Sequence, residues 1–236
     1  MKMIFKNNGF SLAEVLMAVG ILSIGLMLIA TMFPAALYLT TVASERTMAA
    51  IVADEAFAKI KLYGLQTYPS VISDYNNISR SPPIDPNEFS YPSVDPCSTN
   101  FRQYYWSALC KRTDPCEYQV TVFVARKTSP ALTYQGGGEG GIRPKVINVL
   151  VQAGLSSDKL QITTAGQEKN VNPPTAVLDS ATCKIYHIID RNSAIVTLDR
   201  PWEDAATLPG SIWLIPPPVS GGKNADIEVY QEIIKF

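Results

Sequence analysis

A run of apolar residues that begins at Phe10 dominates the N-terminal quarter of the chain. From Phe10 to Ser44 the sequence contains a single charged residue, Glu14. Residues 10–33 would form an α-helix about 36 Å long, which exceeds the ~30 Å hydrocarbon core of a bilayer. The run is too long for the apolar region of a secretory signal peptide, and no Ala-x-Ala cleavage pattern closes it before Ser44. The pattern therefore predicts a membrane-spanning helix.

The helical pattern continues beyond Ser44 but becomes one-sided. Apolar residues recur there at steps of three and four and form one stripe, made of Ala49, Val52, Ala53, Ala56, Ile60 and Tyr63. Gly64 is expected to end the helix. A helix from Ser11 to Tyr63 would be about 80 Å long, and its second half is suited to packing on a globular domain. Pro34 lies inside it and predicts a kink or a break, because proline removes one backbone hydrogen bond.

The remaining pattern is that of an antiparallel β protein. The proline-rich residues 66–97 predict a surface loop, and strands are predicted at 101–109, 117–127 and 144–154. These three strands are expected to form a sheet that covers the apolar stripe of the helix. Five further strands are predicted at 159–164, 183–190, 194–199, 211–215 and 226–236. The predicted fold class is α+β: a long N-terminal α-helix, half of it membrane-spanning, packed on an antiparallel β-sheet and followed by a C-terminal antiparallel β module.

Charge and composition narrow the function classes. The chain has 20 Lys and Arg against 21 Asp and Glu, a formal net charge of −1. Nucleic-acid binding is therefore not expected, because such proteins are normally strongly basic. Lys2 and Lys6 precede the apolar run, so the positive-inside rule places the N-terminus in the cytoplasm and the bulk of the chain on the other side.

Four cysteines, Cys97, Cys110, Cys116 and Cys183, lie in the part expected to be exported. An exported domain permits disulfides. Cys110 and Cys116 flank a predicted turn and could bridge a hairpin, and Cys97 with Cys110 is the alternative pairing. Neither their spacing nor the single histidine suits a zinc site, so no metal and no cofactor are expected.

Little in the sequence indicates catalysis. The glycine tract 136–141 lacks the lysine of a phosphate-binding loop and predicts a hairpin connection. His187 shares a strand face with Ile185 and Ile189, which indicates a partly buried structural histidine rather than a general base. Asp85, Glu88 and Asp95 are loop carboxylates of the kind that can bind calcium, but they match no known loop signature. The chain is expected not to be an enzyme.

The start of the chain resembles the type III signal of type IV pilins and of the pseudopilins of type II secretion. The features that carry this resemblance are a short basic leader, MKMIFKNNG, that ends in Gly9, followed by Phe10, Ser11 and Glu14 at the start of a long apolar helix. The continuation EVLMAVGILSIGL is most similar to the minor pseudopilins of the I/V type. The resemblance covers residues 1–64.

The resemblance implies a division of the chain and a processing step. Residues 1–9 would be the leader, 10–64 the helix with 10–33 as transmembrane segment and filament core, 65–155 a pilin-like β head, and 156–236 the additional β module. The prepilin peptidase would cut between Gly9 and Phe10 and methylate the new amine on Phe10. Glu14 would pair with that amine in a neighbouring subunit. The alternative is that the Glu14 side chain reaches the membrane interface and only caps its own helix. Pro34 would mark where the helix melts on assembly, with a static kink as the alternative.

The expected function is that of a minor pseudopilin or prepilin, a structural subunit of a type II secretion or type IV pilus filament. It would lie in the inner membrane with a periplasmic or extracellular head, and its partners would be the prepilin peptidase and other pilins or pseudopilins. One alternative is a pilin-like binding module for DNA uptake or adhesion, which a basic or aromatic patch in 155–236 would favour. The other is a membrane-anchored domain of different function, such as an enzyme, which would keep an intact N-terminus.

Overall fold

The computed structural model describes residues 11–65, 69–78, 84–93, 102–203 and 209–236. The chain divides at Glu45 into two units, so that the first part of α1 (Leu12–Tyr63) belongs to one unit and its last part, with all the strands, to the other. α1 is uninterrupted at Pro34, and the predicted break is absent. Gly64 follows with a φ of 68°, and its N–H donates to the Ile60 carbonyl at 2.9 Å. The helix therefore ends at the predicted glycine, which adopts the left-handed conformation without steric cost.

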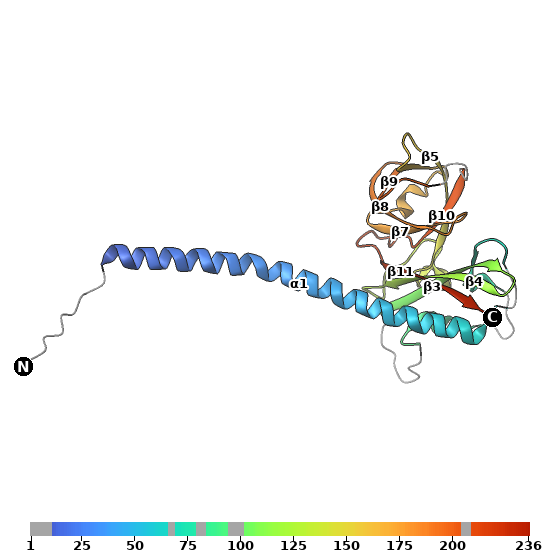
Figure 1. The fold of residues 1–236 in the computed structure, drawn as a ribbon, viewed down its shortest axis with the longest axis horizontal. Coiled ribbons are helices and arrows are strands. Elements are labelled where there is room, and N and C mark those ends of the chain that lie inside the picture. Colours follow the sequence, from blue (N-terminus) through green and yellow to red (C-terminus); the bar gives the residue numbers. More distant parts are fainter. Residues whose placement is uncertain (1–10, 66–68, 79–83, 94–101, 204–208) are drawn as a thin grey trace, which may run out of the picture. The chain divides into compact units, whose positions relative to one another are not determined.

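The last part of α1 packs on a five-stranded antiparallel sheet (Figure 1). Its strands are β1 (Ser73–Asp74), β2 (Ser90–Tyr91), β3 (Tyr104–Asp114), β4 (Glu117–Arg126) and β11 (Asp226–Lys235). They lie in the order β1-β3-β4-β11, with β2 also paired to β3. The buried helix positions are Ala49, Val52, Ala53, Ala56, Phe57 and Ile60. The predicted stripe is thus largely confirmed, although Phe57 was missed and Tyr63 is 43% exposed.

β4 lies in the middle of the sheet and is buried on both faces. Tyr118, Val120, Val122 and Val124 point into the core shared with α1, as their alternation predicted. Phe123 and Ala125, on the other face, belong to a second core that includes Leu109, Leu178 and Ile215. The sheet is therefore covered on one face by α1 and on the other by the β structure that follows β4.

That structure is a closed antiparallel barrel of six strands. They are β5 (Ile147–Ala153), β6 (Lys159–Ile162), β7 (Thr175–Asp179), β8 (Ile185–Asn192), β9 (Ile195–Leu198) and β10 (Gly210–Leu214), in the order β10-β5-β6-β9-β8-β7. Pairing of β7 with β10 closes the ring. Apolar side chains fill the inside, where the rings of Tyr186 and Trp202 stack with centroids 4.8 Å apart. Four short helical turns complete the described chain: η1 (Tyr75–Asn77), η2 (Pro86–Phe89), α2 (Gly138–Gly141) and η3 (Glu168–Asn170).

The barrel corrects the predicted division into a head at 65–155 and a C-terminal module at 156–236. β5 was assigned to the sheet that covers the helix but belongs to the barrel, and β11 was assigned to the module but pairs with β4 of the sheet. Alternation shows that a strand has a buried face, but it does not show which neighbour covers that face. β7 was missed because all five of its residues are buried, which leaves no alternation to detect.

Candidate functional site

The start of α1 is organised around Ser11 and Glu14. The backbone N–H of Glu14 donates to the Ser11 hydroxyl at 3.2 Å and to the Ser11 carbonyl at 3.1 Å, so Ser11 caps the helix. Glu14 therefore lies in the first turn, where a carboxylate is favoured by the positive end of the helix dipole. Its side chain is exposed, and the carboxylate contacts no cation among the described residues.

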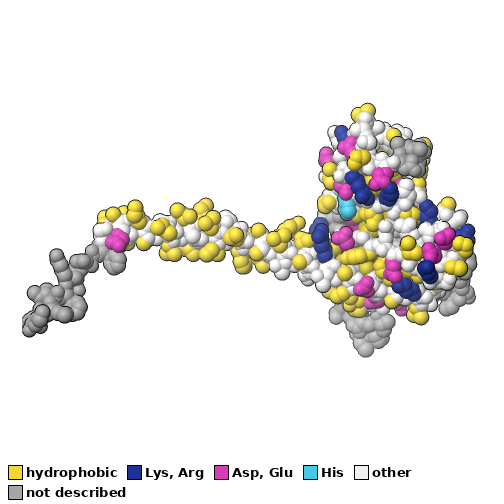
Figure 2. All heavy atoms as spheres, in the orientation of Figure 1, with side chains coloured by type: hydrophobic (Ala, Val, Ile, Leu, Met, Phe, Trp, Pro, Cys, Tyr) yellow, Lys and Arg dark blue, Asp and Glu magenta, His cyan; other side chains and the backbone are white. Residues whose placement is uncertain are grey.

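The surface of this part of α1 is apolar all round. Every residue of 11–41 except Gly25 is exposed, including Leu16 (64%), Met17 (74%) and Phe33 (65%). Figure 2 shows hydrophobic side chains along this stretch, with one acidic group near its beginning. By length and composition, α1 is the one helix of the described chain that could cross a membrane. A helix apolar on every side needs lipid or other protein around it.

Four hydroxyl groups in this stretch are already satisfied inside the helix. Ser23 donates to the Val19 carbonyl at 2.8 Å, and Thr31 donates to the Leu28 carbonyl at 2.9 Å. Thr40 and Thr41 do the same, each to the carbonyl four residues earlier. Such bonds let hydroxyl side chains lie in an apolar environment without an unmet donor. Glu14 is the charged side chain of this segment, and it has no cation among the described residues.

The other residues of the predicted processing and assembly site are only partly placed. Gly9 and Phe10 lie outside the described residues, so the predicted cleavage position stays a prediction. Pro34 lies on the exposed surface of the intact helix. The role predicted for it in assembly likewise stays a prediction.

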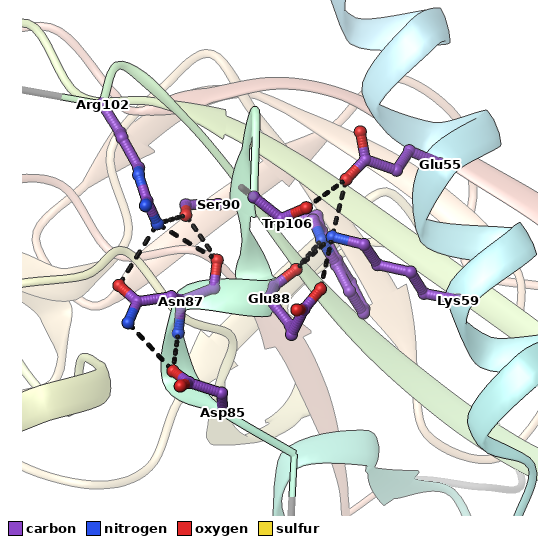
Figure 3. A network of polar contacts seen from close by, with 9 residues as sticks. Glu55, Lys59, Asp85, Asn87, Glu88, Ser90, Arg102 and Trp106 are labelled. Atoms are coloured by element: carbon purple, nitrogen blue, oxygen red, sulfur yellow. Dashed lines mark hydrogen bonds and ion pairs between the residues drawn. The ribbon is translucent and has the colours of Figure 1, made fainter. Parts of the chain in front are cut away.

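A polar network attaches the segment containing η2 to α1 (Figure 3). Nζ of Lys59 lies 2.6 Å from a carboxylate oxygen of Glu55 and 3.0 Å from one of Glu88, and it donates to the Glu88 carbonyl at 2.9 Å. The indole N–H of Trp106 donates to the same carbonyl at 2.9 Å. The Lys59 side chain is 12% exposed. Its charge is therefore compensated by two carboxylates rather than by water.

Two of the three carboxylates considered for calcium have other partners. The Asp85 carboxylate accepts the backbone N–H of Asn87 at 2.8 Å and its side-chain amide at 2.9 Å, and so caps η2. Glu88 binds Lys59 instead, and Asp95 lies outside the described residues. In the part of the chain that the structure describes, no three His, Cys, Asp or Glu side chains are grouped so that they could hold a metal.

The predicted Cys110–Cys116 disulfide does not fit the observed hairpin. Cys110 of β3 lies opposite Val120 of β4, whereas Cys116 lies in the turn between the two strands. The four residue steps from position 116 to position 120 correspond to roughly 13 Å along a strand, whereas bridged cysteines have Cα atoms about 4.4–6.8 Å apart. Cys116 is exposed and carries a free thiol. Cys97, of the alternative pairing, lies outside the described residues.

His187 lies on the outer face of the barrel, where Asp199 is its partner. It shares a strand face with Ile185 and Ile189, as predicted, but that face points outward, and Tyr186 and Ile188 are the residues that point into the barrel. The backbone N–H of His187 donates to the Asp199 carboxylate at 2.9 Å, and its Nδ1 atom lies 3.4 Å from that group. The side chain is half exposed, which is the position of a surface histidine.

Two contacts were not predicted, although the sequence contains their signals. Ser11 followed three residues later by Glu14 is a capping-box pattern, which indicates a helix start at Ser11. Glu55 and Lys59 have the i, i+4 spacing of a helical ion pair, whereas the third member, Glu88, is distant in sequence.

No family model, no curated protein and no solved structure matches this chain.

Proposed function

We propose that this protein is a pilin-like subunit, of the minor pseudopilin or prepilin kind, of a type II secretion or type IV pilus filament. The observation that carries the proposal is the exposed apolar stretch of α1 before Glu45. Its one charged side chain, Glu14, lies in the first turn without a partner among the described residues. A plain membrane anchor has no use for a carboxylate there, because an acidic group in a spanning helix costs a few kcal/mol on insertion scales.

The proposed assembly contact uses a processed N-terminus. Cleavage after Gly9 would leave an amine on Phe10, and such an amine is normally protonated at neutral pH, with a pKa of about 7.7–8.0. This cation would be carried into an apolar environment and needs a carboxylate close by. Glu14 of an adjacent subunit supplies that carboxylate and sets the register between the two helices.

The residues after Glu45 form the head, which would project from the filament on the far side of the inner membrane. Its sheet and barrel are joined by an apolar cluster that includes Phe123 and Leu178, and together they would act as a scaffold for contacts with other subunits or cargo. In this account the chain catalyses no reaction and is itself a substrate of the prepilin peptidase. A membrane-anchored domain of another function would retain Met1 and would not depend on Glu14.

The test is a cross-linking assay in cells with an active filament machine. A cysteine placed at Leu16 is expected to give cross-linked subunits in the wild-type background. The Glu14→Ala variant should remain in the membrane, but its yield of cross-linked product should fall at least about tenfold. The reason is that a buried amine without its carboxylate costs more than ~1.4 kcal/mol. Glu45→Ala is the matched control and should cross-link normally. Undiminished cross-linking of Glu14→Ala would contradict the proposal.

A further inference from the structure

A cavity of about 800 Å³ opens between the outer face of the barrel and the chain that precedes β1. Its volume lies within the range of about 300–1,000 Å³ typical of small-molecule sites. Ser211 and Trp213 of β10 and Asn148 and Leu150 of β5 form its barrel wall. They are directly opposed in pairs, Trp213 to Asn148 and Ser211 to Leu150. All four point outward, because Val149, Ile212 and Leu214, which alternate with them along the two strands, point into the barrel.

The polar groups of this cavity are neutral and can both donate and accept hydrogen bonds. The hydroxyls of Ser180 and Ser211 lie 2.7 Å apart, and either can be the donor. The Asn148 amide donates to the Ser211 hydroxyl at 3.0 Å, which fixes its orientation. The indole N–H of Trp213 has no hydrogen-bond partner in the described structure, although it is shielded from solvent. An unmet donor of this kind costs free energy unless a ligand or water accepts from it.

The charged groups of the cavity are engaged within the protein. The Asp179 carboxylate accepts the backbone N–H groups of Ala181 and Thr182 at 3.0 and 3.1 Å. The Lys111 ammonium donates to the Ala181 carbonyl at 2.6 Å. The two charges also have opposite sign, so the cavity offers no net charge to an ionic ligand.

Apolar side chains form the rest of the lining. Val71 and Leu150 are 69% and 52% exposed at the cavity, and Ile72 lies beside Trp213 in the apolar cluster that joins the barrel to the sheet. An apolar wall next to paired hydroxyl and amide groups matches a ring with C–H faces and hydroxyl edges. A peptide strand is a poorer match, because β5 and β10 are paired on both sides within the closed barrel and have no free backbone edge.

We propose that this cavity binds a neutral saccharide, with Asn148, Ser180 and Ser211 bonding its hydroxyls and Trp213 and Leu150 packing on its ring. The site lies wholly within residues 46–236. It therefore stands independently of the function proposed for the N-terminal helix.

The experiment uses the full-length chain in an amine-oxide detergent, since sugar-based detergents would compete. Chitotriose, cellotriose and maltotriose are the probes, followed by saturation-transfer NMR and by tryptophan fluorescence. Trp213 is the tryptophan at the cavity, because Trp106 and Trp202 are 2% and 5% exposed in the two cores. At least one trisaccharide is expected to bind with millimolar or better affinity, on the order of −4 kcal/mol.

Two variants locate the binding. Asn148→Ala should weaken it about fivefold, the usual effect of losing one neutral hydrogen bond. Trp213→Phe should weaken it by a similar factor, because the smaller ring offers less apolar surface to the sugar. Leu155→Ala is the control, because Leu155 is 91% exposed and lies outside the cavity lining. Thermal unfolding of each variant identifies any that fail to fold. If Trp213→Phe does not fold, the result for Asn148→Ala alone tests the proposal.

Three outcomes would overturn the proposal. The first is no binding of any trisaccharide up to about 10 mM. The second is binding that folded Asn148→Ala and Trp213→Phe leave unchanged. The third is binding of trialanine in place of the sugars, with the same dependence on Asn148, which would assign the cavity to peptides.

Discussion

Two acidic residues, Glu14 and Asp226, lie in settings that carboxylates usually avoid. Glu14 is exposed on an apolar helix and has no cation nearby in the described structure. Asp226 lies where β11 meets the barrel and accepts the Ala176 N–H at 2.9 Å, while its Oδ1 atom is shielded from water and has no partner in the described chain. Sequence alone could single out Glu14, because it interrupts an apolar run. It could not single out Asp226, whose burial depends on strands far away in the chain.

The Asp226 carboxyl makes the stability of the head pH-dependent. Burial raises its pKa from 3.8 to about 6, against the smaller opposing effect of the Ala176 hydrogen bond. A folded-state pKa above the unfolded value means that the folded protein binds more protons. Its stability therefore falls as the pH rises from about 4 to 6, by an amount on the order of 2–3 kcal/mol.

Asp226→Asn is therefore expected to be more stable than wild type at pH 8 and about equally stable at pH 4. Asparagine keeps an oxygen acceptor for Ala176 and carries no charge. Thermal unfolding at the two pH values measures the difference, with the exposed Asp190→Asn as the control. If Asp226→Asn unfolds at a lower temperature than wild type at pH 8, the ionised carboxylate is stabilising there and the prediction is wrong.

At the level of single elements, α1 is the part that sequence predicts best. Its bounds and most of its buried face follow from the 3.6-residue period, since a helix must bury its apolar stripe against a partner. The stripe does not reveal where that partner ends, and this is why Tyr63 was assigned to the core and Phe57 was not. The residues that precede β3 were expected to be a plain loop, but η2 and β2 are held in place by Lys59 of α1 and by pairing with β3.

Replacing Lys59 by methionine tests how strongly η2 is attached to the helix. The change leaves Glu55 and Glu88 as partly buried carboxylates without their cation, and we expect a loss of about 2 kcal/mol of unfolding free energy. Lys61→Met is the matched control two residues further on. Lys61 pairs with Glu232 where both side chains are 40–50% exposed, so its loss should cost less than about 1 kcal/mol. Chemical denaturation measures both variants. An equal loss of unfolding free energy in the two would show that Lys59 does not attach η2 more strongly than a surface ion pair.

At the scale of the whole molecule, the barrel is what sequence analysis could not predict. Most of its strands were found individually, with ends within a few residues of those observed. Closure depends on the pairing of β7 with β10, and the sheet is completed by β11 from the end of the chain. Local alternation carries no information about such long-range pairing. For this reason β5 was placed in the sheet and β11 in the C-terminal module. The cavity beside the barrel was unpredictable for the same reason.

The insertion of the barrel between β4 and β11 predicts that the head cannot be shortened from its C-terminus. A chain ending at residue 155 retains the originally predicted head, but it lacks β11 and leaves β5 without its barrel. We expect this chain to lose cooperative unfolding and to be digested rapidly by protease, while the full-length chain resists. A truncated chain that unfolds cooperatively with Trp106 still buried would restore the original division.

The central claim concerns the N-terminus and its relation to Glu14. The most direct measurement is the intact mass and N-terminal sequence of the protein isolated from its native membrane, from cells with and without the prepilin peptidase. The account predicts a chain that begins at methylated Phe10 when the peptidase is present, and at Met1 when it is absent. A protein that begins at Met1 in both would contradict it.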